Sequence, residues 1–143
     1  MSISVDERLG FPIKSAEVAF MRAKAEALRP LGLTVAQYAA LLTLSDNPGA
    51  SGAGLARACL VTPQAMAATL KTLEAKGLVT RSLDDWDRSS RPVELTGAGR
   101  ELLDRADDAA GSIEQDMYNA LTPTERNTLR ELLHKCEVAV RRR

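Results

Sequence analysis

Two short helical segments joined by a very short turn form the centre of this 143-residue chain. Ser51 is a residue type that caps the start of a helix, and Thr62-Pro63 opens the next helix with proline in the first position, where a missing N–H costs nothing. Only Cys59 to Val61 separate the two segments, and Gly77 is placed to end the second one in a left-handed conformation. The sequence therefore predicts two helices linked by a tight turn.

Amphipathic helices are predicted on the N-terminal side of this centre. Apolar side chains recur every three or four positions over residues 13–27, and this helix is expected to end near Pro30. Thr34 and Gln37 have the spacing of a capping box, in which each side chain satisfies a free backbone N–H. A second helix therefore begins at this point, and it stops at the turn over residues 47–49.

A charged hairpin and two more helices are predicted on the C-terminal side. Val79–Leu83 and Pro92–Leu95 have the composition of strands, and the stretch 84–91 between them is too charged to be core. Thr96 starts a long helix with one apolar face, and a capping box over Thr122–Glu125 opens the last helix. The residues of that helix expected to face inward are Leu129, Leu132, Leu133, Cys136 and Val140.

The composition favours helices, and the charge is informative only through its distribution. Hydrophobic residues make up 45% of the chain but aromatic residues only 3%, which favours packed helices over a sheet-rich fold. The 19 basic and 19 acidic side chains cancel, so the overall basic charge of many nucleic-acid-binding proteins is missing. Residues 52–100 carry seven basic and five acidic side chains, a net charge of +2, whereas residues 101–143 carry seven and nine, a net charge of −2.

The cysteines and the hydropathy pattern indicate a cytoplasmic protein. Cys59 and Cys136 form neither a disulfide framework nor a metal-ligand spacing, and the N-terminus lacks a signal segment. No apolar run approaches the roughly 20 residues that are needed to cross a bilayer. His134, the sole histidine, has no partner for a metal site or a catalytic triad. We expect one domain over residues 1–143, without a membrane span, a metal or a cofactor.

A helix-turn-helix followed by a charged hairpin is an arrangement typical of DNA-binding domains. The second helix of such a unit fits the major groove of DNA, whose width admits an α-helix. The hairpin beside it can carry basic side chains to the adjacent minor groove, where a narrow groove attracts arginine. The order of elements therefore predicts a mainly α winged helix-turn-helix fold with a two-stranded β-wing over about residues 34–96.

From about Phe11 to Val140 the chain resembles the MarR family of bacterial regulators. Each matching segment is weak alone, but their ordered set is specific. The family often has Ser-Arg where this chain has Ala67-Ala68, and glycine is common at the turn position of Leu60. The matching segments are Leu31-Gly32-Leu33-Thr34, Leu55-Ala56-Arg57, Leu73-Glu74-Ala75-Lys76-Gly77-Leu78-Val79, Asp87-Arg88, Leu95-Thr96 with Gly99, and Leu121-Thr122-Pro123 with Glu125 and Arg126.

The resemblance implies a homodimer that binds a palindromic operator in double-stranded DNA. Helices over about residues 13–31 and 101–140 would form the dimer and flank the DNA-binding region. The implied function is transcriptional repression that a small, aromatic effector relieves. Phe11, Phe20, Tyr38 and Met117 are candidates to line the effector pocket, although each of them also suits the protein core.

Eleven residues are candidates for contact with DNA. Arg88 matches the family's wing arginine, and Asp87 beside it can hold its orientation through a charge-assisted contact. On the fourth helix, Gln64 suits an adenine edge, and Ala67 or Pro63 suits a thymine methyl group. The full set is Arg57, Thr62, Pro63, Gln64, Ala67, Ala68, Lys71, Arg88, Ser89, Ser90 and Arg91.

The sequence also leaves classes of function other than DNA-binding repression open. Neutral net charge and Ala67-Ala68 would suit a helical protein-interaction module that has lost strong DNA binding. Cys59 and Cys136 leave open a redox-sensing regulator, although both lie on apolar stripes, where a buried thiol is inert. An enzyme is not expected, because the sequence pairs no nucleophile with a base and has no metal cluster or phosphate-binding glycine loop.

Overall fold

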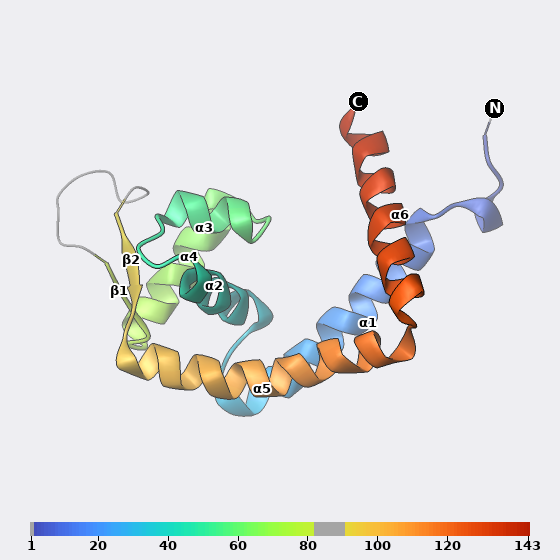
Figure 1. The fold of residues 1–143 in the computed structure, drawn as a ribbon. Helices are drawn as coiled ribbons and strands as arrows, with labels where there is room; N and C mark the ends of the chain where they lie inside the picture. Colours follow the sequence, from blue (N-terminus) through green and yellow to red (C-terminus); the bar gives the residue numbers. More distant parts are fainter. Residues whose placement is uncertain (1, 82–90) are drawn as a thin grey trace. The chain divides into compact units, whose positions relative to one another are not determined.

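The computed structural model describes residues 2–81 and 91–143 (Figure 1). The chain forms two compact units, Met1–Ala110 and Gly111–Arg143. The first unit contains a short 3-10 helix Val5–Glu7, α1 (Gly10–Leu28), a 3-10 helix Arg29–Leu31, α2 (Val35–Asp46), α3 (Gly52–Ala58), α4 (Pro63–Ala75), β1 (Val79–Arg81), β2 (Val93–Leu95) and the first part of α5 (Gly97–Ala120). The second unit contains the rest of α5 and α6 (Pro123–Arg141). The predicted order of elements is confirmed.

Side-chain caps start α2 and α3 where the sequence predicts them. The backbone N–H of Gln37 donates to Thr34 Oγ1 and the N–H of Thr34 donates to Gln37 Oε1, both at 3.1 Å. Ser51 Oγ accepts from the N–H of Gly54 at 3.1 Å. These bonds satisfy N–H groups that the first turn of a helix leaves without a partner. The capping-box prediction for α2 is therefore confirmed.

Two predicted boundaries differ from the structure, and proline accounts for one of them. The first helix begins at Gly10, three residues before the predicted stripe, and it ends at Leu28. The second strand begins at Val93 rather than Pro92, which forms only an isolated bridge with Ser51. Proline has no N–H to donate to a strand ladder, so the regular pairing starts one residue later.

The hydrophobic core of the first unit lies beneath α4 and the base of the hairpin. β1 and β2 pair antiparallel with Val79 opposite Leu95 and Arg81 opposite Val93. Val79 and Val93 are both buried, so the inner face of the hairpin joins the helical core. The largest fully buried side chains are Leu28, Leu41, Leu44, Leu55, Leu70, Leu73, Val79 and Val93.

Polar contacts fix the C-terminal end of α4 to the rest of the first unit. Lys76 Nζ donates to the carbonyl oxygen of Gly32 at 2.7 Å. Thr96 Oγ1 donates to the carbonyl oxygen of Gly77 at 2.7 Å and accepts from the N–H of Gly99 at 3.0 Å. Gly77 has a φ of 73°, the left-handed conformation that the sequence predicts at the end of this helix. The end of α4, the hairpin and the start of α5 therefore meet at one point.

The second unit places an apolar face of α6 at the surface. The N–H of Thr122 donates to Glu125 Oε1 at 2.8 Å, and this bond is the main cause that lowers the pKa of the Glu125 carboxyl. The prediction that the apolar residues of α6 face inward is wrong for this single chain, because the helix contains no buried residue. Leu129, Leu132 and Leu133 are each about half exposed. A unit of this size offers α6 too little surface to cover such a stripe.

None of the helices in the described ranges 2–81 and 91–143 is long and apolar enough to cross a membrane.

Gly99 is expected to be indispensable for the junction between α4 and α5. A Cβ atom at this position would overlap the carbonyl oxygen of Leu78, a backbone atom that cannot move freely. Gly99→Ala should lower the free energy of unfolding by about 3 kcal/mol, measured by urea denaturation. Gly97→Ala is the matched control, because a Cβ there meets nothing within 4 Å. Equal stability of the two variants would contradict this account of the junction.

Candidate nucleic-acid interface

One face of α4 is buried and the opposite face is open to solvent. Met66, Leu70 and Leu73 are all buried in the core. Their spacing of four and three residues makes a single stripe, so the remaining residues of the helix point away from the core. The six predicted DNA-contact residues of this helix and its cap are all exposed, namely Thr62, Pro63, Gln64, Ala67, Ala68 and Lys71.

The turn between α3 and α4 closes through two backbone hydrogen bonds. The N–H of Leu60 donates to the carbonyl oxygen of Arg57 at 3.3 Å, and the N–H of Val61 donates to that of Ala56 at 3.0 Å. This pair of bonds is the Schellman motif, which requires a left-handed residue after the helix. Leu60 occupies that position with a φ of 59°, at a cost of about 1–2 kcal/mol for a residue with a Cβ atom. Arg57 is exposed in the last turn of α3.

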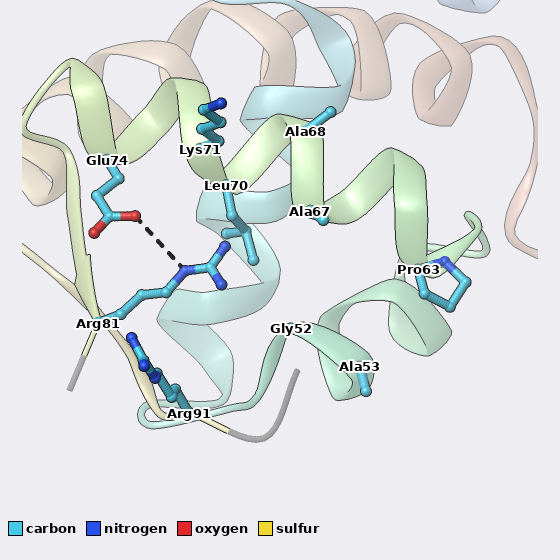
Figure 2. Close-up of a pocket in the computed structure, with 10 residues that line it drawn as sticks. All are labelled: Gly52, Ala53, Pro63, Ala67, Ala68, Leu70, Lys71, Glu74, Arg81 and Arg91. Carbon is cyan, nitrogen blue, oxygen red and sulfur yellow. Dashed lines mark ion pairs between the residues drawn. The ribbon is translucent and has the colours of Figure 1, made fainter. Parts of the chain in front are cut away.

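A hollow of about 610 Å³, the α4 groove, lies along α4. Figure 2 shows Arg81 reaching from β1 toward α4, with Arg91 beside it. The groove joins four predicted contact residues of α4 with the predicted Arg91 of the hairpin. Its lining residues are Gly52, Ala53, Pro63, Ala67, Ala68, Leu70, Lys71, Glu74, Arg81 and Arg91.

Arg81 and Glu74 also line the groove, although neither is among the contact residues predicted from the sequence. Arg81 Nε lies 3.8 Å from Glu74 Oε2, and the arginine side chain is only 13% exposed (Figure 2). Because side chains alternate along a strand, Arg81 is on the same face as the buried Val79. That period of two is the signal that could have identified Arg81 as a residue facing inward.

The α4 groove contains basic side chains whose hydrogen-bond donors are not all paired within the described part of the chain. Among the described residues, the Nε atoms of Arg81 and Arg91 are buried and have no hydrogen-bond partner. A buried donor without an acceptor costs free energy, so an acceptor that reaches these atoms would be stabilised. Lys71 and these two arginines outnumber Glu74, and the groove therefore favours an anion.

Three predicted contact residues of the wing, Arg88, Ser89 and Ser90, lie outside the described residues. Gln64 and Arg57 are exposed but do not line the α4 groove. Thr62 lies at the start of α4, where its Oγ1 accepts from the N–H of Ala65 at 3.1 Å. The groove therefore unites part of the predicted contact set.

Two of the four predicted pocket residues meet around one lysine. Lys24 Nζ lies 4.7 Å from the ring centre of Phe20 and 5.3 Å from that of Tyr38. Tyr38 is buried, and its hydroxyl donates to Asp107 Oδ1 at 2.6 Å. This cluster joins α1, α2 and α5 around a cation that faces two aromatic rings.

The other two predicted pocket residues lie elsewhere. Phe11 is 80% exposed in the first turn of α1, about 13 Å along the helix from Phe20. Met117 belongs to the second unit, where it lines a hollow of about 330 Å³ together with Tyr118 and Arg126. Within the first unit, only Phe20 and Tyr38 of the predicted set therefore lie close together.

The two cysteines are partly buried and do not form a metal site. Cys59 Sγ lies 3.4 Å from Thr43 Oγ1 and 3.7 Å from the carbonyl oxygen of Ala39, to which it donates. Cys136 is also partly buried, in α6. The described ranges contain no group of three or more His, Cys, Asp or Glu side chains that could hold a metal ion.

Comparisons with known proteins identify the family. The MarR family pattern matches residues 31–88. The transcriptional repressor Rv2887 of Mycobacterium tuberculosis is 34% identical over 135 residues, which are 94% of this chain and 97% of the relative. A crystal structure of Rv2887 in complex with DNA has a TM-score of 0.70 at 34% identity and covers 90% of this chain and 97% of the other.

This chain is also similar to solved structures of proteins that bind aromatic acids or are regulated by them. Rv2887 in complex with salicylic acid has a TM-score of 0.69 at 34% identity, covering 94% of this chain and 99% of the other. A solved structure of BpsR of Bordetella bronchiseptica, whose DNA binding is regulated by 6-hydroxynicotinic acid, has a TM-score of 0.83 at 26% identity. It covers 96% of this chain and 98% of the other. The predicted winged helix-turn-helix fold is confirmed, and the chain belongs to the MarR family of transcriptional regulators.

Proposed function

We propose that this protein is a homodimeric repressor that binds a palindromic DNA operator and is released by a small aromatic acid. The observation that carries the proposal is the open face of α4 beside the α4 groove, where Lys71, Arg81 and Arg91 gather. An α-helix with one exposed face fits the major groove of DNA. Its flanking basic residues can hold the phosphate backbone and so fix the helix in register.

The roles of the individual residues follow from their chemistry. Gln64 is exposed in the first turn of α4 and suits an adenine edge, whereas Lys71 and Arg91 suit phosphates. We assign Arg88 of the wing to the minor groove, where a narrow groove has the most negative potential. The acidic residues around it, Asp84 and Asp87 among them, should lower nonspecific affinity.

A dimer is supported by apolar surface on the terminal helices. The exposed large apolar side chains include Ile13, Val18 and Met21 of α1, and Leu132 and Leu133 of α6. Apolar surface of this extent on a small soluble domain indicates a covered interface. We propose that helices over about residues 13–31 and 101–140 cover one another between two copies, so that residues 1–143 act as one domain of a symmetric pair.

The effector site is proposed at the cluster of Phe20, Lys24 and Tyr38. The Lys24 ammonium lies within about 5 Å of both ring centres, so an aromatic acid could pair its carboxylate with Lys24 and place its ring against Phe20. Salicylic acid and 6-hydroxynicotinic acid, named with the similar proteins, have this chemistry. Such a ligand relieves repression only if it binds one geometry of the dimer more tightly than the other.

We further propose that the protein works by binding rather than by catalysis, and that it does so in the cytoplasm, where it meets its operator. Two alternatives have different support. Partial burial of Cys59 and Cys136 leaves a redox-sensing regulator as a second candidate. The small apolar residues Ala67 and Ala68 on the outer face of α4 suit a protein-interaction module.

DNA binding is tested by selecting duplexes from a random library and measuring fluorescence anisotropy across a salt series. We expect a palindrome whose half-sites lie about one helical turn apart. Arg88→Ala should weaken binding by about tenfold or more and reduce the salt slope by about two for a dimer, because one ionic contact per subunit is lost. Arg8→Ala is the control, because Arg8 is exposed and lies outside both the proposed DNA contacts and the proposed dimerisation helices. No enriched duplex and no effect of Arg88→Ala would favour the interaction module.

The dimer is tested by sedimentation equilibrium at micromolar concentration. The wild-type protein should have a mass of twice 15.4 kDa, and Leu132→Asp should shift it toward the monomer because a carboxylate cannot be buried there without cost. DNA affinity should fall on the order of 100-fold, because the two halves no longer bind as one unit. Glu131→Gln, at the neighbouring exposed position, should stay dimeric. A monomeric wild type that binds the palindrome would refute this mechanism.

The effector site is tested by titrating salicylate into the complex of protein and operator. Salicylate should release the wild-type protein, whereas Lys24→Gln should keep its DNA affinity and lose the response, because the counter-charge of the carboxylate is gone. Lys14→Gln is the matched control on the same helix, where Lys14 pairs with Glu17 at 3.6 Å at the surface. A full response of Lys24→Gln would place the effector elsewhere.

A further inference from the structure

Leu60 combines a strained backbone with an exposed apolar side chain. Among the described residues it is the single non-glycine residue with a positive φ, 59°. Leu60 is 86% exposed, the largest value among the exposed large apolar residues of the described ranges. The conformation and the exposure are both unfavourable for leucine, whereas glycine would adopt this conformation without strain.

The fold itself gives no reason for leucine at this position. The Schellman bonds from Leu60 to Arg57 and from Val61 to Ala56 fix the left-handed conformation through backbone atoms alone. Glycine would make both bonds without strain. Burial of the side chain would offset the strain, but Leu60 is almost fully open to solvent. The leucine side chain is therefore available for contact with another molecule.

The position of Leu60 relates it to α4 rather than to the terminal helices. Every other exposed large apolar residue of the described ranges lies between residues 3 and 21 or between residues 117 and 140, except its neighbour Val61. Leu60 and Val61 directly precede Thr62, the N-cap of α4. The first turn of a recognition helix is the part that approaches base edges in the major groove.

The outer face of α4 beside Leu60 also contains apolar residues. Pro63, Ala67 and Ala68 line the α4 groove. The hydroxyl groups there are engaged within the chain, since Thr62 Oγ1 accepts from the N–H of Ala65 and Thr72 Oγ1 donates to the carbonyl oxygen of Ala68. In the major groove, the apolar feature that distinguishes one base from the others is the methyl group of thymine.

We propose that Leu60 determines operator specificity by contacting the methyl group of a thymine in each half-site. This inference rests on the proposed function, because it needs the first turn of α4 to enter the major groove. DNA binding then covers the apolar side chain of Leu60 at the start of α4, and this burial offsets the cost of the strained backbone. Burial of one methyl group corresponds to a factor of about four in affinity for each half-site.

The experiment combines variants of Leu60 with operators that lack single thymine methyl groups. The operator selected with the wild-type protein is resynthesised with deoxyuridine in place of one symmetric pair of thymines at a time, and affinities are measured by anisotropy. Leu60→Asn and Leu60→Gly both tolerate the left-handed conformation but remove the apolar contact. Leu60→Met is the matched apolar control.

The expected result is a coupling between Leu60 and one thymine position. For wild type and Leu60→Met, one symmetric deoxyuridine pair should weaken binding by about 15-fold, the effect of two half-sites. Leu60→Asn and Leu60→Gly should lose affinity by a similar factor on the thymine operator and show no further loss at that pair. Their salt slopes should equal that of the wild type, because no ionic contact is removed. Leu60→Gly should also raise Tm by about 3 °C, since the strain is relieved.

Three outcomes separate this inference from the proposed function. If the wild type selects no operator, the proposed function fails. If the wild type binds its operator and the Asn and Gly variants bind it equally well, only the Leu60 inference is overturned. A loss of affinity in those variants that is independent of every deoxyuridine pair would overturn the thymine contact as well, because it would indicate a contact without base specificity.

Discussion

The core beneath α4 is the packing interaction on which the rest of the first unit depends. Leu70 and Leu73 on the inner side of the helix are fully buried, together with Val79 and Val93 of the two strands. One apolar core therefore holds the recognition helix and the base of the wing, and a close-packed interior moves little. DNA binding needs such rigidity, because a helix and a hairpin that enter different grooves must keep a fixed spacing.

Polar contacts at the end of α4 complete this arrangement. Lys76 binds the carbonyl oxygen of Gly32, and Thr96 binds that of Gly77, so the carbonyl groups at two chain turns are satisfied. At the opposite end, Thr62 caps α4 and Leu60 closes the preceding turn under strain. The polar groups at the C-terminal end of α4 are thus well satisfied, and the strain lies at the end that would face DNA, as is typical of functional sites.

Charge and apolar surface are unevenly distributed over this neutral chain. Among the described residues, Lys71, Arg81 and Arg91 line the α4 groove with Glu74 as the one opposing acid, whereas most of the exposed large apolar residues lie between residues 3 and 21 or between residues 117 and 140. These two kinds of surface suit two partners, a polyanion and a second copy of the chain. The net charge of the chain indicates neither of these surfaces, because the 19 basic and 19 acidic side chains cancel.

The sequence by itself determined the helices, their caps and the turn, because hydrophobic period and capping are local properties of neighbouring residues. Thr34 with Gln37, Ser51 and Gly77 all act as predicted. The sequence also indicated the exposed face of α4. Only the tertiary structure decided that Arg81 joins Glu74 in the α4 groove, that Lys24 joins Phe20 to Tyr38, and that the apolar stripe of α6 stays exposed in one chain. These are contacts, or missing contacts, between residues far apart in the chain, and their distances depend on how whole elements pack rather than on any local pattern.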